Sequence, residues 1–143
     1  MPIYRDKIRI KTNGFCSIHD ITIDVARIIS ESGITQGICC VAVSGSTAAI
    51  STIEYEPGLL EDIPRFMEKL IPSNISYEHD KTWHDGNGFS HLRSFLIKTS
   101  ITVPFDNAKL NLGTWQQIVV VDFDNRSRSR DIIVQLVGEC NNV

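Results

Sequence analysis

A chain of 143 residues has the most common length of one folded domain, so a single domain spanning residues 1–143 is expected. Hydrophobic residues make up 42% and charged residues 22%, an ordinary globular composition that argues against a disordered or fibrous protein. The net charge of -3 gives no overall attraction for nucleic acid, and neither a transmembrane span nor a secretory signal is visible. We therefore expect a cytoplasmic protein that binds neither nucleic acid nor a membrane.

The amino-terminal segment predicts a strand followed by a helix. Residues 4–12 alternate apolar and charged side chains, which is typical of a half-buried strand. Asp20 is expected to cap a helix over residues 21–33, whose apolar residues recur at helical spacing. Gly33 is suited to the left-handed conformation that ends many helices.

Two strands and a second helix are expected next. Residues 36–44 and 48–56 are rich in β-branched and apolar residues and are separated by a tight turn at Gly45-Ser46. Apolar residues at spacings of three and four predict an amphipathic helix over residues 59–72. Pro64 is compatible with that helix if it falls in the first turn.

The second half of the chain predicts a loop followed by strands. Residues 77–91 show no apolar periodicity and are expected to form a loop. Strands are expected over residues 93–105, 110–124 and 128–139, separated by short polar turns. This order favours an α+β fold: one compact domain with a mostly antiparallel, β-sandwich-like core and two to three helices.

The cysteines are predicted to be chemically inert. They are Cys16, Cys39, Cys40 and Cys140. No C-x-x-C spacing is present, and adjacent residues of a strand point to opposite faces, so Cys39 and Cys40 cannot readily bind one metal ion together. Buried free thiols are the expected state.

The densest group of chemically active side chains falls in the expected loop over residues 77–91. It comprises His79, Asp80, His84, Asp85, Asn87, Ser90 and His91. Imidazole and carboxylate groups are ordinary ligands of zinc and related metals, and histidine also transfers protons near neutral pH. The composition indicates a metal or proton-transfer site, and a polar loop whose side chains cap its own backbone is the structural alternative.

Two further groups of polar residues lie around the central strands. Ser46 and Thr47 follow the turn glycine and offer hydroxyl and backbone N–H groups to a phosphate, although a plain turn fits the same spacing. Glu54 and Glu56 would share one strand face, where a close pair of carboxylates raises the pKa of one of them. We assign Glu54 to a solvated sheet edge and Glu56 to the site.

Three arginines alternate at the start of the last expected strand, at Arg126, Arg128 and Arg130. On one strand face their guanidinium groups would be suited to a phosphate or a carboxylate, including one from another subunit. A charged, solvated sheet edge is the structural alternative. In the preceding strand Gln116 and Gln117 point to opposite faces, so one of these amides is expected to enter a pocket.

The chain resembles a known family in the order and length of several sequence blocks. These are GSTAAISTIEYEPGLLED, the Y-x-H-D stretch at residues 77–80, WHDGNGFSHLR, SITVPF, LNLGTWQQIVVVDFD and the spaced arginines before IIVQLVGE, which together cover roughly residues 36–139. They are similar to the YjbQ-like family of small uncharacterised proteins, also described as secondary thiamine-phosphate synthases, and most similar to its archaeal branch. The resemblance implies a compact α+β domain that assembles as a homotrimer.

The resemblance also implies an activity and a set of site residues. The activity is weak formation of thiamine phosphate from a hydroxyethylthiazole phosphate and a hydroxymethylpyrimidine diphosphate, so the partner is a phosphorylated small molecule. The residues expected to be catalytic are His91, His79, Asp85 and Glu56. Those expected to bind substrate are Ser46, Thr47, Asn87, Ser90, Arg93 and Gln116. A divalent metal, zinc or magnesium, would be held by His79, Asp85 and His91.

One position departs from the family pattern. Phe89 stands where the family usually has a histidine, in N-G-H-S-H or N-A-H-A-H. On a strand, a histidine two residues before His91 would face the same way and pair with it. We therefore expect Phe89 to weaken metal binding, and Phe89→His to strengthen it.

Two alternative functions use the same residues. A non-catalytic metabolite-binding or metal-binding oligomer would retain the pocket without the chemistry, and Phe89 favours it. A metal-dependent phosphate hydrolase would use the same ligands on a different substrate. Ligand-induced stabilisation without turnover separates the first alternative from an enzyme, and substrate screening separates the second.

Overall fold

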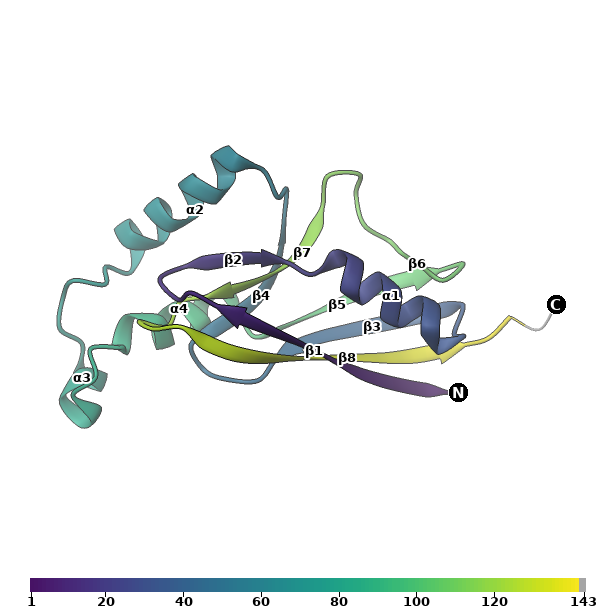
Figure 1. Cartoon of the computed structure of the whole chain (residues 1–143), viewed down its shortest axis with the longest axis horizontal. Coiled ribbons are helices and arrows are strands. Elements are labelled where there is room, and N and C mark those ends of the chain that lie inside the picture. Colours follow the sequence, from purple (N-terminus) through teal and green to yellow (C-terminus); the bar gives the residue numbers. More distant parts are fainter. Residues whose placement is uncertain (142–143) are drawn as a thin grey trace.

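The computed structural model describes residues 1–141 and shows helices and strands in the mixed order expected of an α+β protein (Figure 1). The elements are β1 (Ile3–Thr12), β2 (Ser17–Asp20), α1 (Thr22–Ser32), β3 (Gln36–Val43), β4 (Ala48–Ile53), α2 (Pro57–Leu70), α3 (Glu78–Trp83), α4 (Gly88–Ile97), β5 (Ser100–Asp106), β6 (Lys109–Leu110), β7 (Gln117–Asp122) and β8 (Arg128–Glu139).

The strands form two sheets in which every described pairing is antiparallel. The larger sheet has the order β1-β8-β3-β5-β6, and the smaller has the order β2-β7-β4. The predicted α+β class with a mostly antiparallel core is confirmed. Within residues 1–141 there are four helices instead of two to three, because the expected loop is largely helical.

The small sheet is buried on both faces and separates two apolar clusters. Along β7, Ile118 and Val120 pack with α1 and the inner face of the large sheet. Val119 and Val121 point the other way and pack with Met67 of α2. Burial on both faces explains why β7 is a continuous apolar run, without the alternation of a half-exposed strand.

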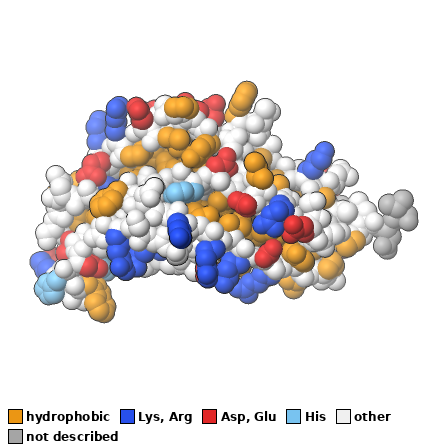
Figure 2. Space-filling model, viewed as in Figure 1, with side chains coloured by type: hydrophobic (Ala, Val, Ile, Leu, Met, Phe, Trp, Pro, Cys, Tyr) orange, Lys and Arg blue, Asp and Glu red, His pale blue; other side chains and the backbone are white. Residues whose placement is uncertain are grey.

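The outer face of the large sheet is polar along β1. Alternate residues of this strand, Arg5, Lys7, Arg9 and Lys11, are exposed, and basic side chains gather along the lower edge of the molecule (Figure 2). Ile8 and Thr12 point inward and are buried. The period of two identified from the sequence is therefore confirmed for this strand.

One buried ion pair links the two sheets. Arg130 of β8 donates through Nε and Nη2 to the two oxygens of Asp122, at the end of β7, over 2.7 and 2.9 Å. Thr12 of β1 also donates to Asp122, and Thr47, between β3 and β4, accepts from Arg130 over 2.6 Å. Burial by itself would raise the Asp122 pKa, but the hydrogen bonds from Arg130 and Thr12 outweigh it and hold that pKa below its usual value.

The two strands expected on either side of Gly45-Ser46 are present, but they do not pair with each other. β3 belongs to the large sheet and β4 to the small one, so the chain crosses between sheets at this point. The crossing is close to Arg130, because a Cβ added at Gly45 would lie 2.7 Å from Nη1 of that arginine. Gly45 also has a φ of 135°, which residues with a side chain rarely adopt. Both this backbone conformation and the close approach of Arg130 therefore require a glycine here.

The second helix begins earlier than predicted. α2 starts at Pro57, which places Pro64 in the helix interior instead of the first turn. An interior proline removes one backbone hydrogen bond, and it is tolerated here because the helix packs an apolar face on the small sheet. β4 ends at Ile53, so Glu54 and Glu56 do not share a strand face.

The predicted loop at residues 77–91 and strand at residues 93–105 are also wrong. This region contains α3 and α4, and only its last part forms β5. The buried face of α4 consists of Gly88, Phe89, Ser90, Arg93 and Ser94. Because most of that face is polar, an apolar pattern does not reveal the helix.

The remaining comparisons concern three short or divided strands and the ends of α1. The predicted strand over residues 110–124 is two strands, β6 and β7, separated by the non-strand segment 111–116. β2 was not predicted because it has only four residues. α1 ends at Gly33 in the left-handed conformation, as expected, and Asp20 accepts from the N–H and hydroxyl of Thr22.

The cysteines are free within the described residues, and burial makes two of them poorly reactive. Burial raises the pKa of Cys39 to about 12 and that of Cys16 to about 11. Cys39 is buried and Cys40 partly exposed, consistent with opposite strand faces. Among residues 1–141, no helix has the length and apolar character needed to cross a membrane.

We predict that Arg130→Met lowers the free energy of unfolding by about 3–5 kcal/mol, because it leaves the Asp122 carboxylate buried without its partner. Denaturant unfolding monitored by circular dichroism measures the change. Arg9→Met is the matched control, since Arg9 pairs with Asp131 at the surface, and a far smaller effect is expected. Equal effects of the two substitutions would contradict the role assigned to the buried pair.

Candidate functional site

Three of the predicted site residues meet where α3, α4 and the segment between them come together. His79 of α3 lies with its Nδ1 3.8 Å from Oδ1 of Asp85, in the segment that joins the two helices. The ring of His91, on α4, stacks on that of His79 with 4.2 Å between centroids and 37° between planes. The predicted grouping of His79, Asp85 and His91 is therefore present in the structure.

Asp80 fixes the relative position of the two helices that carry the histidines. Its Oδ2 accepts from the backbone N–H of Tyr77, at the start of α3, and its Oδ1 from that of Gly88, at the start of α4, both over 2.9 Å. These two hydrogen bonds hold the Asp80 pKa below its usual value. His84 closes α3 with a φ of 57° and so turns the chain toward Asp85.

The donor atoms around His79 are of the types that could hold a divalent metal ion. One donor atom each of His79, Asp80 and Asp85 lies within 4.8 Å of the others. Nδ1 of His79 is buried and has no hydrogen-bond partner among residues 1–141, which is the state of a ligand atom free to coordinate. Compared with the predicted triad, Asp80 takes the place of His91 in this set.

His91 is suited to remain neutral. Burial lowers its pKa and His79 lowers it further, while the carboxylates of Asp85 and Asp124 act in the opposite direction without reversing the shift. A neutral imidazole has one nitrogen that donates a hydrogen bond and one that accepts a proton.

Asp124 is a further site residue that the sequence reasoning did not select. It is fully buried, and its Oδ2 accepts from the hydroxyl of Thr47 over 2.9 Å and from Nε of Arg128 over 3.1 Å. Its Oδ1 has no hydrogen-bond partner within residues 1–141. A signal was present in the sequence, because two aspartates around Phe123 directly follow a buried apolar strand.

Asn87 and Ser90 connect α4 to the segment between β7 and β8. The Ser90 hydroxyl donates to the backbone and side-chain oxygens of Asn87, and the same Asn87 side-chain oxygen accepts from the N–H of Asn125. Ser90 is fully buried and Asn87 nearly so. Both predicted substrate ligands therefore position the start of α4 beside Asp124.

The other predicted substrate ligands near the sheets are engaged within the protein. Thr47 is 6% exposed and bonds to Asp124 and Arg130. Of the three arginines expected on one strand face, Arg126 lies before β8 and is exposed. Arg128 and Arg130 share a face and pair with Asp124 and Asp122, so the carboxylates that they bind belong to this chain. Ser46, in contrast, is exposed.

Arg93 lies inside the molecule. Its guanidinium donates to the carbonyl of Ile71 and to Glu68 of α2, and stacks over the rings of Phe89 and Phe123. Its side chain is 3% exposed. Arg93 thus fastens α4 to the end of α2.

Glu56 and Gln116 lie away from the histidines. Glu56 caps α2 by accepting from the N–H groups of Gly58 and Leu59. Gln116 donates to Thr52 and lines a separate cavity on the β4 and β5 side of the molecule. Neither residue lines a cavity that also contains His79 or His91.

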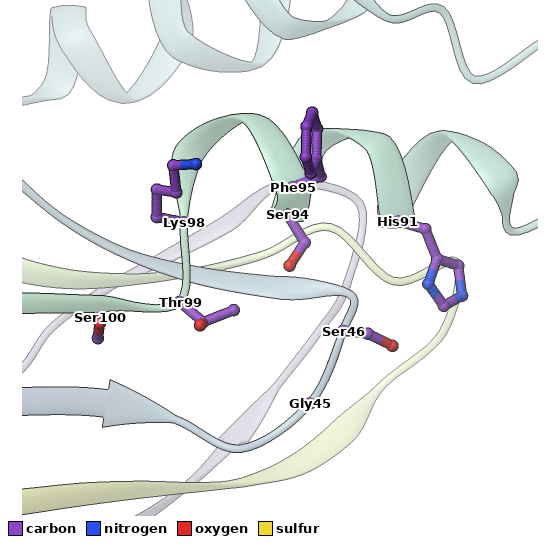
Figure 3. A pocket seen from close by; sticks show the side chains of 8 residues that line it. All are labelled: Gly45, Ser46, His91, Ser94, Phe95, Lys98, Thr99 and Ser100. Carbon is purple, nitrogen blue, oxygen red and sulfur yellow. The ribbon is translucent and has the colours of Figure 1, made fainter.

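Two cavities meet at His91. One, of about 430 Å³, is lined by Tyr77, Glu78, His79, Gly88, His91 and Leu92. The other, of about 400 Å³, is lined by Gly45, Ser46, His91, Ser94, Phe95, Lys98, Thr99 and Ser100 (Figure 3). His91 therefore lines both cavities.

The strand argument for Phe89 is wrong. Residues 89 and 91 lie on α4, where they point roughly 200° apart around the helix axis. Phe89 is 3% exposed and packs against the guanidinium of Arg93, 4.9 Å from its ring centroid. A histidine at this position would enter the interior and would not join His91.

We accordingly predict that Phe89→His leaves metal affinity unchanged and lowers the free energy of unfolding by at least about 2 kcal/mol, because it replaces a buried apolar ring beneath the Arg93 guanidinium with a smaller polar one. Isothermal calorimetry with zinc and thermal unfolding measure the two effects. Phe66→His, at a phenylalanine 60% exposed on α2, is the control for stability. A clear gain in zinc affinity for Phe89→His would contradict the helical placement.

Comparisons with known proteins agree on one family. The sequence profile described as "UPF0047 protein YjbQ-like" matches residues 6–139. A UPF0047 protein of Archaeoglobus fulgidus is 40% identical over 129 residues, covering 90% of this chain and 98% of that protein. The crystal structure of a YbjQ-like protein of unknown function from Sulfolobus solfataricus is similar, with a TM-score of 0.91 and 36% identity over 96% of this chain and 99% of that one.

A hypothetical protein of Aeropyrum pernix shares the same fold, with a TM-score of 0.88 and 32% identity over 95% of this chain and 99% of that one. These relatives are archaeal, in agreement with the branch expected from the sequence. The protein belongs to the UPF0047, or YjbQ-like, family.

Proposed function

We propose that this protein is a metal-assisted enzyme that acts on phosphorylated small molecules, with weak formation of thiamine phosphate as its activity. The observation that carries the proposal is the cluster of donor atoms from His79, Asp80 and Asp85 beside the neutral ring of His91. Such a cluster combines a place for a cation with a group that moves protons or donates a hydrogen bond, which chemistry at a diphosphate requires.

In the proposed reaction, a ring nitrogen of the thiazole phosphate forms a bond to the methylene carbon of the pyrimidine diphosphate. The carbon–oxygen bond breaks, and its electron pair leaves with the diphosphate, so atoms and charge balance without an oxidant or a further reactant. His79, Asp80 and Asp85 would hold a divalent cation, which would supply positive charge to the departing diphosphate.

Residues of the chain orient the reactants and stabilise the negative charge of the leaving diphosphate. His91 donates a ring N–H to an oxygen of the leaving diphosphate. Ser46 is exposed at the neighbouring cavity and offers its hydroxyl to a phosphate oxygen. Asn87, whose side-chain oxygen accepts from the N–H of Asn125, keeps the start of α4, and with it His91, in place.

A second candidate function is metabolite binding without turnover. It is favoured by the internal engagement of Glu56, Arg93 and Gln116, which removes three of the polar groups expected to contact substrate. A metal-dependent phosphate hydrolase would use the same cluster at His79. Product analysis separates the three functions, because only the hydrolase releases inorganic phosphate and the binding protein releases no product.

Assembly as a homotrimer belongs to this proposal. An apolar row crosses the outer face of the large sheet, where Ile3, Val137, Ile38 and Pro104 are cross-strand neighbours. Ile3 and Ile38 are 66% and 49% exposed, as expected of side chains that a second copy covers. Light scattering at micromolar concentration is expected to report a trimer, and a monomer would contradict this part of the proposal.

We predict that the purified protein holds a divalent metal in near-stoichiometric amount and that Asp85→Asn reduces the metal content and thiamine-phosphate formation together. Elemental mass spectrometry and product chromatography measure the two quantities. The reason is that Asp85 supplies the carboxylate nearest to the unpartnered Nδ1 of His79.

The matched control is His84→Asn, which removes a histidine from the same segment. His84 is exposed and has a positive φ, a conformation that asparagine tolerates well. It should leave both quantities unchanged. A metal-free wild-type protein that still forms thiamine phosphate would contradict the proposed mechanism, and stabilisation by substrate without product would favour the binding function.

A further inference from the structure

The cavity lined by Ser46 and Lys98 is built from three separate segments. Gly45 and Ser46 come from the crossing between the two sheets. His91, Ser94 and Phe95 come from α4, and residues 98–100 run from the link after α4 into the first residue of β5 (Figure 3). Side chains from parts of the chain far apart in sequence thus face one space of about 400 Å³.

Hydroxyl groups dominate the polar lining of this cavity. The Ser94 hydroxyl is not free to donate to a ligand, because it donates to the carbonyl of Ala48 over 2.6 Å. The hydroxyls of Ser46, Thr99 and Ser100 make no hydrogen bond to another group within residues 1–141. Free hydroxyl groups along one cavity wall can donate to the several lone pairs of an oxyanion.

Lys98 adds the positive charge that an oxyanion requires. Its ammonium lies 5.5 Å from the centre of the Phe95 ring, at the rim of the cavity, and pairs with no carboxylate of residues 1–141. The eight lining residues of the described chain include no carboxylate either. Its flexible four-carbon stem allows the ammonium to turn from the ring to a bound anion.

The backbone at Lys98 has a conformation normally reserved for glycine. Its φ is 83° and its ψ is 160°. Both sheets impose this geometry, because the carbonyl of Lys98 accepts from Ile50 in β4 and that of Thr99 accepts from Val43 in β3. A lysine here is strained where a glycine would not be, and backbone strain of this kind clusters at binding sites.

From these observations we infer that the cavity lined by Ser46, Lys98 and Thr99 is an oxyanion subsite, in which Lys98 binds a terminal phosphate or carboxylate of the substrate. The subsite lies across His91 from the donor cluster at His79. A substrate that spans both cavities has an anionic end at Lys98 and its reacting group beside His79 and Asp85.

This inference deepens the proposed function. It assigns a binding site to the anionic group of the proposed substrate that lies away from the reacting atoms. It rests on that function only for the identity of the substrate, because the subsite itself contains no metal-ligand candidate other than His91. Anion binding is therefore measurable with the metal removed.

The test is a titration of the ¹⁵N-labelled protein with inorganic phosphate, and separately with acetate, in the presence of a chelator. Phosphate is expected to shift the amide signals of Ser46, Thr99 and Ser100. Lys98→Met is expected to weaken phosphate binding about tenfold, because it removes one charge-assisted contact. Lys98→Arg, which retains the charge, is expected to remain within about threefold of the wild type.

Two further variants keep the test decisive. Lys98→Gly fits the backbone conformation without strain, so it is expected to fold with an unchanged or raised melting temperature and still to lose phosphate affinity. Lys69→Met removes an exposed lysine from α2 and should leave affinity unchanged. Tighter binding of phosphate than of acetate supports a phosphoryl subsite, and the reverse supports a carboxylate subsite.

Wild-type affinity in both Lys98→Met and Lys98→Gly would overturn the inference, as would signal shifts confined to other parts of the protein. Lys98-dependent phosphate binding in a protein that forms no thiamine phosphate would support the subsite and contradict the proposed function alone. Thiamine-phosphate formation that persists at the wild-type KM in Lys98→Met would support the proposed function and contradict the subsite.

Discussion

The carboxylate of Asp122 and the guanidinium of Arg130 meet in the interior between the two sheets, and much of the structure depends on this contact. Two charges removed from water are tolerated only when each is well paired, and here Thr12 and Thr47 satisfy further positions around the pair. The contact fixes the end of β7 against the start of β8. It also requires a glycine at position 45, because Arg130 lies against that residue.

The candidate site is connected to the Asp122–Arg130 pair by hydrogen bonds. Thr47 bonds to both Arg130 and Asp124, and Asn87 bonds to the segment that follows Asp124. α4 therefore begins at a position determined by the inter-sheet contact, and His91 lies one turn into that helix. The link after α4 is held by both sheets, so the two cavities that share His91 have walls fixed by the same framework.

Local periodicity was enough to predict β1 and α1, since each buries an apolar face at the spacing of its secondary structure. Apolar, β-branched composition and turn signals were enough to predict β3 and β8. Local periodicity missed α4 because the buried face of that helix carries polar side chains, and two of them, Arg93 and Ser94, bond to partners far away in sequence at Ile71 and Ala48. The same limit applies to the site. Composition identified His79, Asp85 and His91, but the internal engagement of Arg93 and the strained backbone of Lys98 arise from tertiary contacts alone.

The most direct test of this framework is a carbon-13 NMR titration of the Asp122 side-chain carboxyl in the folded protein. Hydrogen bonds from Arg130 and Thr12 hold its pKa below the usual value, so the pair stabilises the fold above about pH 4 and loses this contribution as the pH falls through the folded-state pKa. We predict that Asp122 stays ionised below the pH at which an exposed aspartate is half protonated. Protonation at or above that pH would show that burial outweighs the pair, and would contradict the account of how the sheets and the site are held together.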